Sequence, residues 1–166
     1  MKNVFIIALV ILFFSCESEQ ERSSVNPVNW KKRAVQLNIG DSLIYGETYL
    51  SIYSQIYSYT EHRTHDLTST ISMRNTSITD TIYVLSARYF DTHGKLIRTY
   101  FKQTIYIAPM ETVAIVIDEV DKEGGTGANF LFDWAIQPDC TEPLFEGIQL
   151  STAGRISFTT AGKRIK

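Results

Sequence analysis

The residues best suited to chemistry lie between Asp118 and Asn129, where acidic side chains flank three closely spaced glycines. Gly124, Gly125 and Gly127 form the sequence Gly-Gly-Thr-Gly. A phosphate-binding loop requires a helix directly after such glycines, with a lysine and a serine or threonine in register. Here an alternating apolar segment follows, which predicts a strand. We therefore expect no nucleotide site, and we interpret the glycines as permitting a close approach of the backbone.

The acidic residues of the same loop offer a second possibility, a calcium site. Calcium takes about six to eight oxygen ligands, and Asp118, Asp121 and Glu123 could supply carboxylates. Their spacing does not follow the EF-hand pattern. Acidic loops are usually solvated, so we expect no metal and keep these three residues as the calcium candidates.

Zinc binding and nucleophilic catalysis have less support. His62, His65 and Asp66 are too closely spaced on an expected turn for a zinc site, and His93 lies far along the chain. A nucleophile such as Cys140 needs a base within hydrogen-bond reach, and nothing local supplies one. The chain also lacks a Gly-x-Ser-x-Gly elbow. We therefore expect no enzyme activity and no cofactor.

Tyrosine recurs every four residues at Tyr45, Tyr49, Tyr53 and Tyr57. On a strand these side chains share one face. A solvent-facing row of tyrosines could stack on sugar rings or on a partner, since tyrosine combines apolar area with a polar tip. The alternative is that the rings cover the core, as aromatic residues more often do.

The segments that position these residues alternate with a period of two, which predicts strands that each bury one face. β-branched and aromatic residues dominate them, as strands prefer. The apolar positions are Leu67, Ile71 and Met73; Val113, Ile115 and Ile117; Phe130, Phe132, Trp134 and Ile136; Leu144, Ile148 and Leu150; and Ile156 and Phe158.

Turn signals separate these segments at short intervals, at Asn75–Asp80, Asp91–Gly94, Ala108–Glu111 and Gly124–Gly127. The Tyr49–Tyr59 segment fits a helical face or a strand, and its serine and β-branched content favours a strand. Many short strands with frequent turns predict an all-β fold, a single immunoglobulin-like antiparallel β-sandwich.

The N-terminus predicts export and lipidation. Lys2 precedes an apolar run over Val4–Phe14, which is too short to span a membrane, and Ser15-Cys16 follows. This arrangement resembles the lipobox of bacterial lipoproteins, with Phe13 in the place usually held by leucine. We expect a signal peptide over residues 1–15, diacylglycerol on the Cys16 thiol, a polar linker over 16–33 and the sandwich over 34–166.

Composition limits the remaining possibilities. The 166 residues suit one folded domain. The formal net charge of −2 argues against a nucleic-acid partner, which a basic patch would attract. Lipidated Cys16 would leave Cys140 without an intramolecular partner, and we expect it to be buried and inert. We expect a lipid anchor in the cell envelope, at the outer membrane, with either a periplasmic or a surface orientation.

Three segments resemble the signature segments of a bacterial family known as domain of unknown function 3124. They are Asp66–Thr76, Arg88–Leu96 and Gly124–Phe130, with Gly154–Phe158 and Gly162 fitting as well. The resemblance extends in order from Tyr45 to Ile165. It implies an exported or lipid-anchored protein and supplies no reaction, since none is assigned to the family. The residues that match its motifs are Asp91, Gly94, Gly124, Gly125, Gly127 and Asn129.

Together these features predict a non-catalytic binding or structural module of the envelope, whose partner is an envelope protein or a glycan. One alternative is a carbohydrate-binding module that uses the tyrosine-rich face. The other is a calcium-dependent or hydrolytic domain that uses residues 118–129. The candidate ligand-binding residues are Asp91, Asp118, Asp121, Gly124, Gly125, Gly127, Asn129, Tyr49, Tyr53 and Tyr57.

Overall fold

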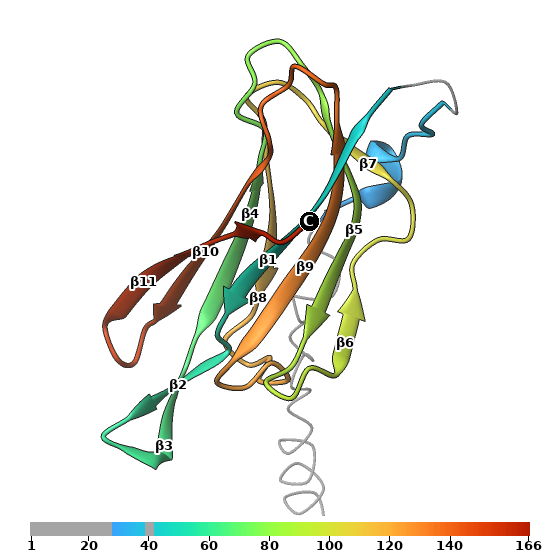
Figure 1. The fold of residues 1–166 in the computed structure, drawn as a ribbon. Coiled ribbons are helices and arrows are strands. Elements are labelled where there is room, and N and C mark those ends of the chain that lie inside the picture. Colours follow the sequence, from blue (N-terminus) through green and yellow to red (C-terminus); the bar gives the residue numbers. More distant parts are fainter. Residues whose placement is uncertain (1–27, 39–41) are drawn as a thin grey trace, which may run out of the picture.

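A computed structural model describes residues 28–38 and 42–166 (Figure 1). The predicted signal peptide, Cys16 and most of the predicted linker lie outside the described residues. A 3-10 helix, η3 (Trp30–Arg33), precedes the strands. The strands are β1 (Ile44–Ile52), β2 (Gln55–Ser58), β3 (Thr60–Asp66), β4 (Thr68–Arg74), β5 (Ile82–Phe90), β6 (Leu96–Thr99), β7 (Ile105–Ile107), β8 (Thr112–Ile117), β9 (Ala128–Ile136), β10 (Leu144–Ser151), β11 (Ile156–Ala161) and β12 (Lys163–Arg164).

The strands form two sheets packed face to face, with a projecting hairpin at one end (Figure 1). The larger sheet has the order β12-β1-β9-β5-β6, and β7 pairs with β5 as its sixth strand. The smaller sheet has the order β11-β10-β4-β8, and β2 and β3 form the hairpin. Neighbouring strands are antiparallel throughout these sheets. The predicted all-β antiparallel sandwich is confirmed.

A chain of stacked aromatic rings crosses the core. Phe130 of β9 stacks on Tyr89 of β5 with ring centroids 4.9 Å apart, and on Phe132 at 5.4 Å. Phe132 in turn stacks on Phe145 of β10, in the other sheet, at 4.2 Å. All four rings are buried. The alternation predicted for Phe130–Ile136 is confirmed, and it joins the two layers.

The buried face of β10 is the reverse of the one that its sequence indicates. The apolar residues Leu144, Ile148 and Leu150 point outward and are exposed, whereas Phe145 and Gln149 are buried. At Gly147 the inner face has no room for a side chain because β10 passes close to β1: a β-carbon there would lie 2.6 Å from Ile52 Cδ1. In β11, likewise, Ile156 is exposed.

The strand interpretation of Tyr49–Tyr59 is confirmed, with a break. β1 ends at Ile52, and the chain bends at Ser54 before β2 begins. The backbone amides of Ser54 and Gln55 both donate to the Gly125 carbonyl, at 3.1 and 3.0 Å. The Gly-rich loop therefore holds the chain at this bend.

The folded domain includes residues that precede position 34. Trp30 of η3 is buried and packs against Phe101, with ring centroids 4.9 Å apart. Arg33 forms a two-pronged ion pair with Glu111, at 2.6 and 3.0 Å. The Val35 amide donates to the Thr104 carbonyl at 3.0 Å. Within residues 28–38 and 42–166, no helix has the length and hydrophobicity needed to span a bilayer.

Candidate functional site

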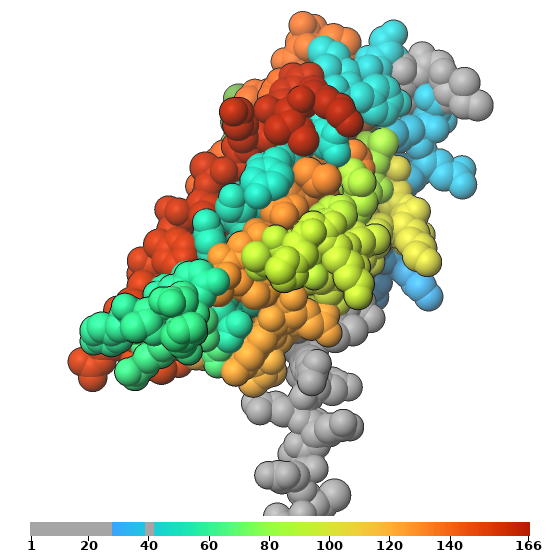
Figure 2. Space-filling model, turned by 60° about the horizontal axis from the view of Figure 1, so that its bottom comes forward, coloured from blue at the N-terminus to red at the C-terminus, as the bar shows by residue number. Residues whose placement is uncertain are grey.

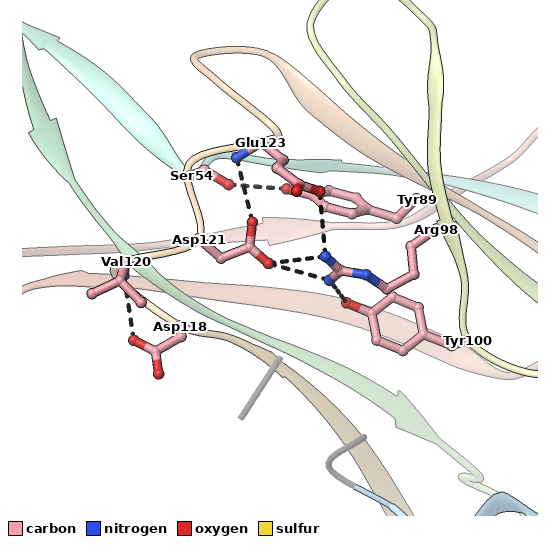
Figure 3. A network of polar contacts seen from close by, with 8 residues as sticks. All are labelled: Ser54, Tyr89, Arg98, Tyr100, Asp118, Val120, Asp121 and Glu123. Atoms are coloured by element: carbon pink, nitrogen blue, oxygen red, sulfur yellow. Dashed lines mark hydrogen bonds and ion pairs between the residues drawn. The ribbon is translucent and has the colours of Figure 1, made fainter. Parts of the chain in front are cut away.

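The loop that follows β8 turns inward, so that its central carboxylate lies inside the sandwich (Figure 3). The Asp121 side chain is 1% exposed and accepts hydrogen bonds from both terminal nitrogens of Arg98, each at 3.2 Å. Arg98 comes from β6 and also donates to the Tyr100 hydroxyl at 3.1 Å and to Glu123 at 3.4 Å. The buried carboxylate is thus paired and hydrogen-bonded, as its burial requires.

A second buried contact holds the same loop (Figure 3). The hydroxyl groups of Tyr89 and Ser54 are hydrogen-bonded at 2.9 Å. Both lie against Gly124, where a β-carbon would overlap the Tyr89 oxygen and lie 2.8 Å from the Ser54 oxygen. Burial raises the pKa of Tyr89, so its hydroxyl stays protonated. Gly124 therefore serves the close backbone approach that its sequence context predicts.

Hydrogen bonds join Gly124 and Gly127 to the hairpin that follows β5. Thr92 donates to the Gly124 carbonyl through its amide (3.1 Å) and its hydroxyl (2.9 Å). The Gly127 amide donates to the Thr92 hydroxyl at 2.9 Å. Gly125 has a φ of +68°, a region that favours glycine. These glycines tie three separate segments together at one end of the sandwich.

Asp91 closes the turn between β5 and β6. Its Oδ1 accepts the backbone amides of Lys95 and His93, each at 2.8 Å, and these bonds lower the pKa of Asp91. Gly94 has a φ of +78° in the same turn, as its position predicts. Asp91 therefore acts as a turn residue.

The calcium candidates do not converge on a common point. Asp121 and Glu123 are both paired with Arg98, and Asp118 Oδ1 accepts a hydrogen bond from the Val120 amide at 3.3 Å. Across the described ranges, 28–38 and 42–166, no three His, Cys, Asp or Glu side chains are grouped so as to hold a metal ion. The polar atoms of the loop instead hold the end of the sandwich together.

The tyrosines do not form one continuous row. Tyr45 and Tyr49 lie on the outer face of β1 and are 57% and 37% exposed. Tyr53 follows the end of β1 and packs edge-on against Phe158 of β11, with centroids 5.7 Å apart. Tyr57 lies on the projecting hairpin, where its hydroxyl and that of Thr126 are 3.2 Å apart. Only the first two remain available together on one sheet face.

Beside Tyr45, the outer face of the six-stranded sheet is hollowed by a pocket of about 530 Å³. Figure 2 shows this face, with β1 (cyan), β9 (orange) and β5 to β6 (yellow-green) in neighbouring bands and the C-terminal residues (red) beside β1. A volume of this size is typical of small-ligand sites. The lining residues are Tyr45, Gly46, Glu47, Leu85, Ser86, Asp133, Trp134 and Lys166.

Three strands bring charged groups together at this pocket. Glu47 of β1 lies opposite Asp133 of β9, and Arg88 of β5 donates to both carboxylates at 3.1 Å. The Ser86 hydroxyl also donates to Asp133. Arg88 Nε is buried and has no hydrogen-bond partner among the described residues. A register shift between Val84 and Ser86 is centred here, and such bulges often re-aim side chains at sites.

Lys166 completes the charge network from the C-terminal segment. Its ammonium lies 2.7 Å from Glu47 Oε2, and the side chains of Lys166 and Glu47 are 78% and 10% exposed. Glu47 Oε1 accepts the Arg88 bond on its other side. The hydrogen bond and charge of Lys166, followed by those of Arg88, hold the pKa of Glu47 below its ordinary value. At neutral pH Glu47 is therefore a charged acceptor in the pocket.

Trp134 packs on the inner face of the strands that form this pocket. A β-carbon on Gly46 would lie 2.5 Å from Trp134 Cε2, so the indole lies directly over the glycine. The indole nitrogen donates to the Thr48 hydroxyl at 2.9 Å, and the Arg164 guanidinium lies 5.1 Å from the ring centroid. The strands that carry Glu47 and Asp133 are thereby fixed relative to each other.

The other predicted chemical groups lie elsewhere. The His62 side chain is 85% exposed on β3 and contacts the neighbouring Glu61. Cys140 is buried, its thiol hydrogen-bonds the Thr141 carbonyl at 3.4 Å, and burial raises the pKa of that thiol. The predicted burial of Cys140 is confirmed, and a raised thiol pKa disfavours the reactive thiolate.

A family model described as "Protein of unknown function (DUF3124)" matches residues 45–165. The chain belongs to this family. The family match confirms the resemblance inferred from the three signature segments, and the matched range includes both the Gly-rich loop and the strands of the outer-face pocket. No curated protein matches the chain.

Among solved structures, the chain is similar to one titled "Crystal Structure of Thermotoga maritima 1070". The two chains are 10% identical, with a TM-score of 0.45, and the match covers 71% of this chain and 92% of the other.

Sequence reasoning missed the charged members of the pocket. Glu47 stands between Tyr45 and Tyr49, and Asp133 stands among apolar residues on the outward positions of its strand. Arg88 lies two residues after Ser86 on β5, where Ser86 is the residue opposite Asp133. A single charge in the middle of an outward strand face is the signal that these positions share.

Proposed function

We propose that this protein is a non-catalytic binding module of the bacterial cell envelope, and that its ligand is a glycan held on the outer face of the six-stranded sheet. The observation that carries the proposal is the pocket lined by exposed Tyr45, Glu47 and Asp133, whose two carboxylates share Arg88. Aromatic faces suit the apolar faces of sugar rings, and fixed carboxylates and hydroxyls suit sugar hydroxyl groups.

The charge state of the pocket supports binding over hydrolysis. Hydrolysis by a carboxylate pair needs one acid whose pKa is raised, so that it carries a proton at neutral pH. Glu47 has a lowered pKa, and both Glu47 and Asp133 accept hydrogen bonds from the same Arg88 nitrogen. Glu47 held in this way accepts hydrogen bonds but has no proton to deliver at neutral pH.

The test of glycan binding is an array probed with the full chain, purified in a detergent that has no sugar headgroup. We expect binding to a subset of glycans, and a loss of about tenfold or more in affinity for Tyr45→Ala, because stacking on an aromatic ring is lost. Tyr59→Ala is the matched control, since Tyr59 is 94% exposed on the projecting hairpin. Absence of binding to every glycan, or equal losses for both variants, would overturn the proposal.

The envelope anchor is supported by the N-terminal sequence alone and needs a separate experiment. Cells fed a fatty acid with a clickable group should label the wild-type chain and its Cys140→Ser variant, but not Cys16→Ser. The two cysteines are the whole cysteine content of the chain, so each variant controls for the other. Label on Cys16→Ser, or none on the wild type, would contradict the anchor.

A further inference from the structure

The pocket already holds a primary ammonium group supplied by the chain itself. Lys166 Nζ lies 2.7 Å from Glu47 Oε2, although the lysine side chain is largely exposed. The backbones of the two residues are joined separately, by the Glu47 amide to the Lys166 carbonyl at 3.3 Å and by the reverse bond at 3.4 Å. The lysine side chain can therefore leave Glu47 while its backbone stays in place.

The side-chain charges of the pocket balance only when Lys166 is counted. Glu47 and Asp133 supply two negative charges, and Arg88, which is shared between them, supplies one positive charge. Withdrawal of the Lys166 side chain leaves one carboxylate charge in excess. With Lys166 in place the Glu47 side chain is only 10% exposed, and withdrawal of the lysine frees Oε2 for another cation. A site in that state favours a cation over a neutral or anionic group.

The contact with Lys166 is easy to replace. Ion pairs that involve a well-exposed lysine contribute little, because solvent screens them and the long side chain loses freedom. An ammonium group on a rigid sugar ring has little conformational freedom to lose when it binds. Its pairing with Glu47 therefore costs less entropy than that of the flexible lysine side chain. Tyr45, in the same pocket, offers an exposed aromatic face for that ring.

We propose that the pocket binds a saccharide that carries a free primary ammonium group, and that this group takes the place of Lys166 Nζ on Glu47. The inference rests on the proposed glycan-binding function and narrows its ligand to amino sugars. Lys166 is then an internal competitor that lowers affinity and excludes weaker ligands.

The test compares three hexasaccharides that differ at carbon 2 of each ring: β-1,4-linked glucose, N-acetylglucosamine and glucosamine. Calorimetric titration of the full chain is done at mildly acidic pH, where the glucosamine amines are charged and Glu47, with its lowered pKa, is still ionised. We expect the glucosamine hexamer to bind about tenfold or more tightly than the other two, because it forms a charge-assisted hydrogen bond.

Two variants assign this preference to the pocket. Lys166→Ala should raise affinity for the glucosamine hexamer about two- to fivefold, by removing the competitor. Lys102→Ala is the matched control, since it removes the same charge from an exposed loop. Glu47→Gln should abolish the preference, so that the glucosamine hexamer binds no more tightly than the glucose hexamer. Thermal unfolding of this variant beside Lys102→Ala shows whether it is folded.

The outcomes separate the two proposals. Equal binding of all three hexamers would overturn the amino-sugar inference and leave glycan binding intact. Failure of all three hexamers to bind would overturn both the glycan-binding proposal and the amino-sugar inference for β-1,4-linked ligands of this class. A preference for glucosamine that neither Lys166→Ala nor Glu47→Gln alters would overturn the assignment to this pocket.

Discussion

Gly124 lies so close to Tyr89 that a β-carbon on the glycine would overlap the tyrosine hydroxyl oxygen. The same hydroxyl is hydrogen-bonded to Ser54 at 2.9 Å, so the three residues join the Gly-rich loop, β5 and the bend after β1. The most conspicuous sequence motif of the chain is thereby explained by packing.

Gly124→Ala should lower the free energy of unfolding by about 2–3 kcal/mol, since the added methyl overpacks a buried site and breaks the Tyr89–Ser54 bond. Gly127→Ala is the control, because its β-carbon would lie no closer than 3.4 Å to Thr92 and its φ is not positive. Urea unfolding measures both. Equal losses for the two glycines would show that backbone freedom, rather than the Tyr89 contact, sets the requirement.

Asp121→Asn should cost about 2–4 kcal/mol, because it leaves the Arg98 guanidinium with less compensation in a buried setting. Glu123→Gln removes the other carboxylate from the same guanidinium, but Glu123 is well exposed. Its expected effect is about 0.5 kcal/mol or less. Thermal unfolding of the two variants tests the difference, and a small loss for Asp121→Asn would contradict the proposed dependence on the buried pair.

The reversed face of β10 predicts different effects of substitution at Phe145, which is buried, and at Ile148, which is exposed. Phe145→Ala should destabilise the protein by about 3–5 kcal/mol, because it removes a buried ring stacked on Phe132. Ile148→Thr, on the exposed face, should change stability by about 0.5 kcal/mol or less. Guanidinium unfolding curves compare them. The opposite ranking would mean that β10 pairs in the register that its hydrophobicity indicates.

The Arg33–Glu111 pair makes the N-terminal segment sensitive to acid. The hydrogen bond from Arg33 lowers the pKa of Glu111 below its ordinary value of 4.5, so this pair stabilises the fold above that pH. The contribution should be lost as the pH falls below 4.5 and through the folded-state pKa, because protonated Glu111 no longer pairs with arginine.

Arg33→Ala should therefore cost about 1 kcal/mol at neutral pH, and the difference from wild type should shrink in acid. Hydrogen exchange of the Val35 amide, which donates to Thr104, reports the local change. Lys32→Ala, one residue earlier in η3, should leave that exchange unaltered. A cost that stays constant as the pH falls would exclude the carboxylate as its source.

The sandwich could be predicted because most of its strands carry a clear period of two. Phe130, Phe132 and Trp134 are buried as predicted, and so are Val113 and Ile115. The same reasoning predicts the wrong buried face for β10. Its inner face passes close to β1 at Gly147, and this constraint comes from another strand. Local hydrophobicity does not contain this information.

The pocket was beyond sequence reasoning for a related reason. Glu47, Arg88 and Asp133 come from β1, β5 and β9, and they meet only because the sheet order is β1-β9-β5. Alternation places each of the three on an outward face but does not give strand order. The glycines and acidic residues of 118–129 stand out in the sequence because they are close together. In the structure they form structural contacts with other segments of the fold.

Burial of Trp30 also sets how far the domain could travel from a membrane. If Cys16 carries the proposed lipid, 13 residues, and so 14 Cα–Cα steps, separate the anchor from Trp30 in the core. A fully extended chain covers at most about 3.6 Å per residue, so the core would lie within a shell about 50 Å deep. Ligands within that shell would meet the pocket at a high local concentration, while polymers beyond it would have to come to the membrane.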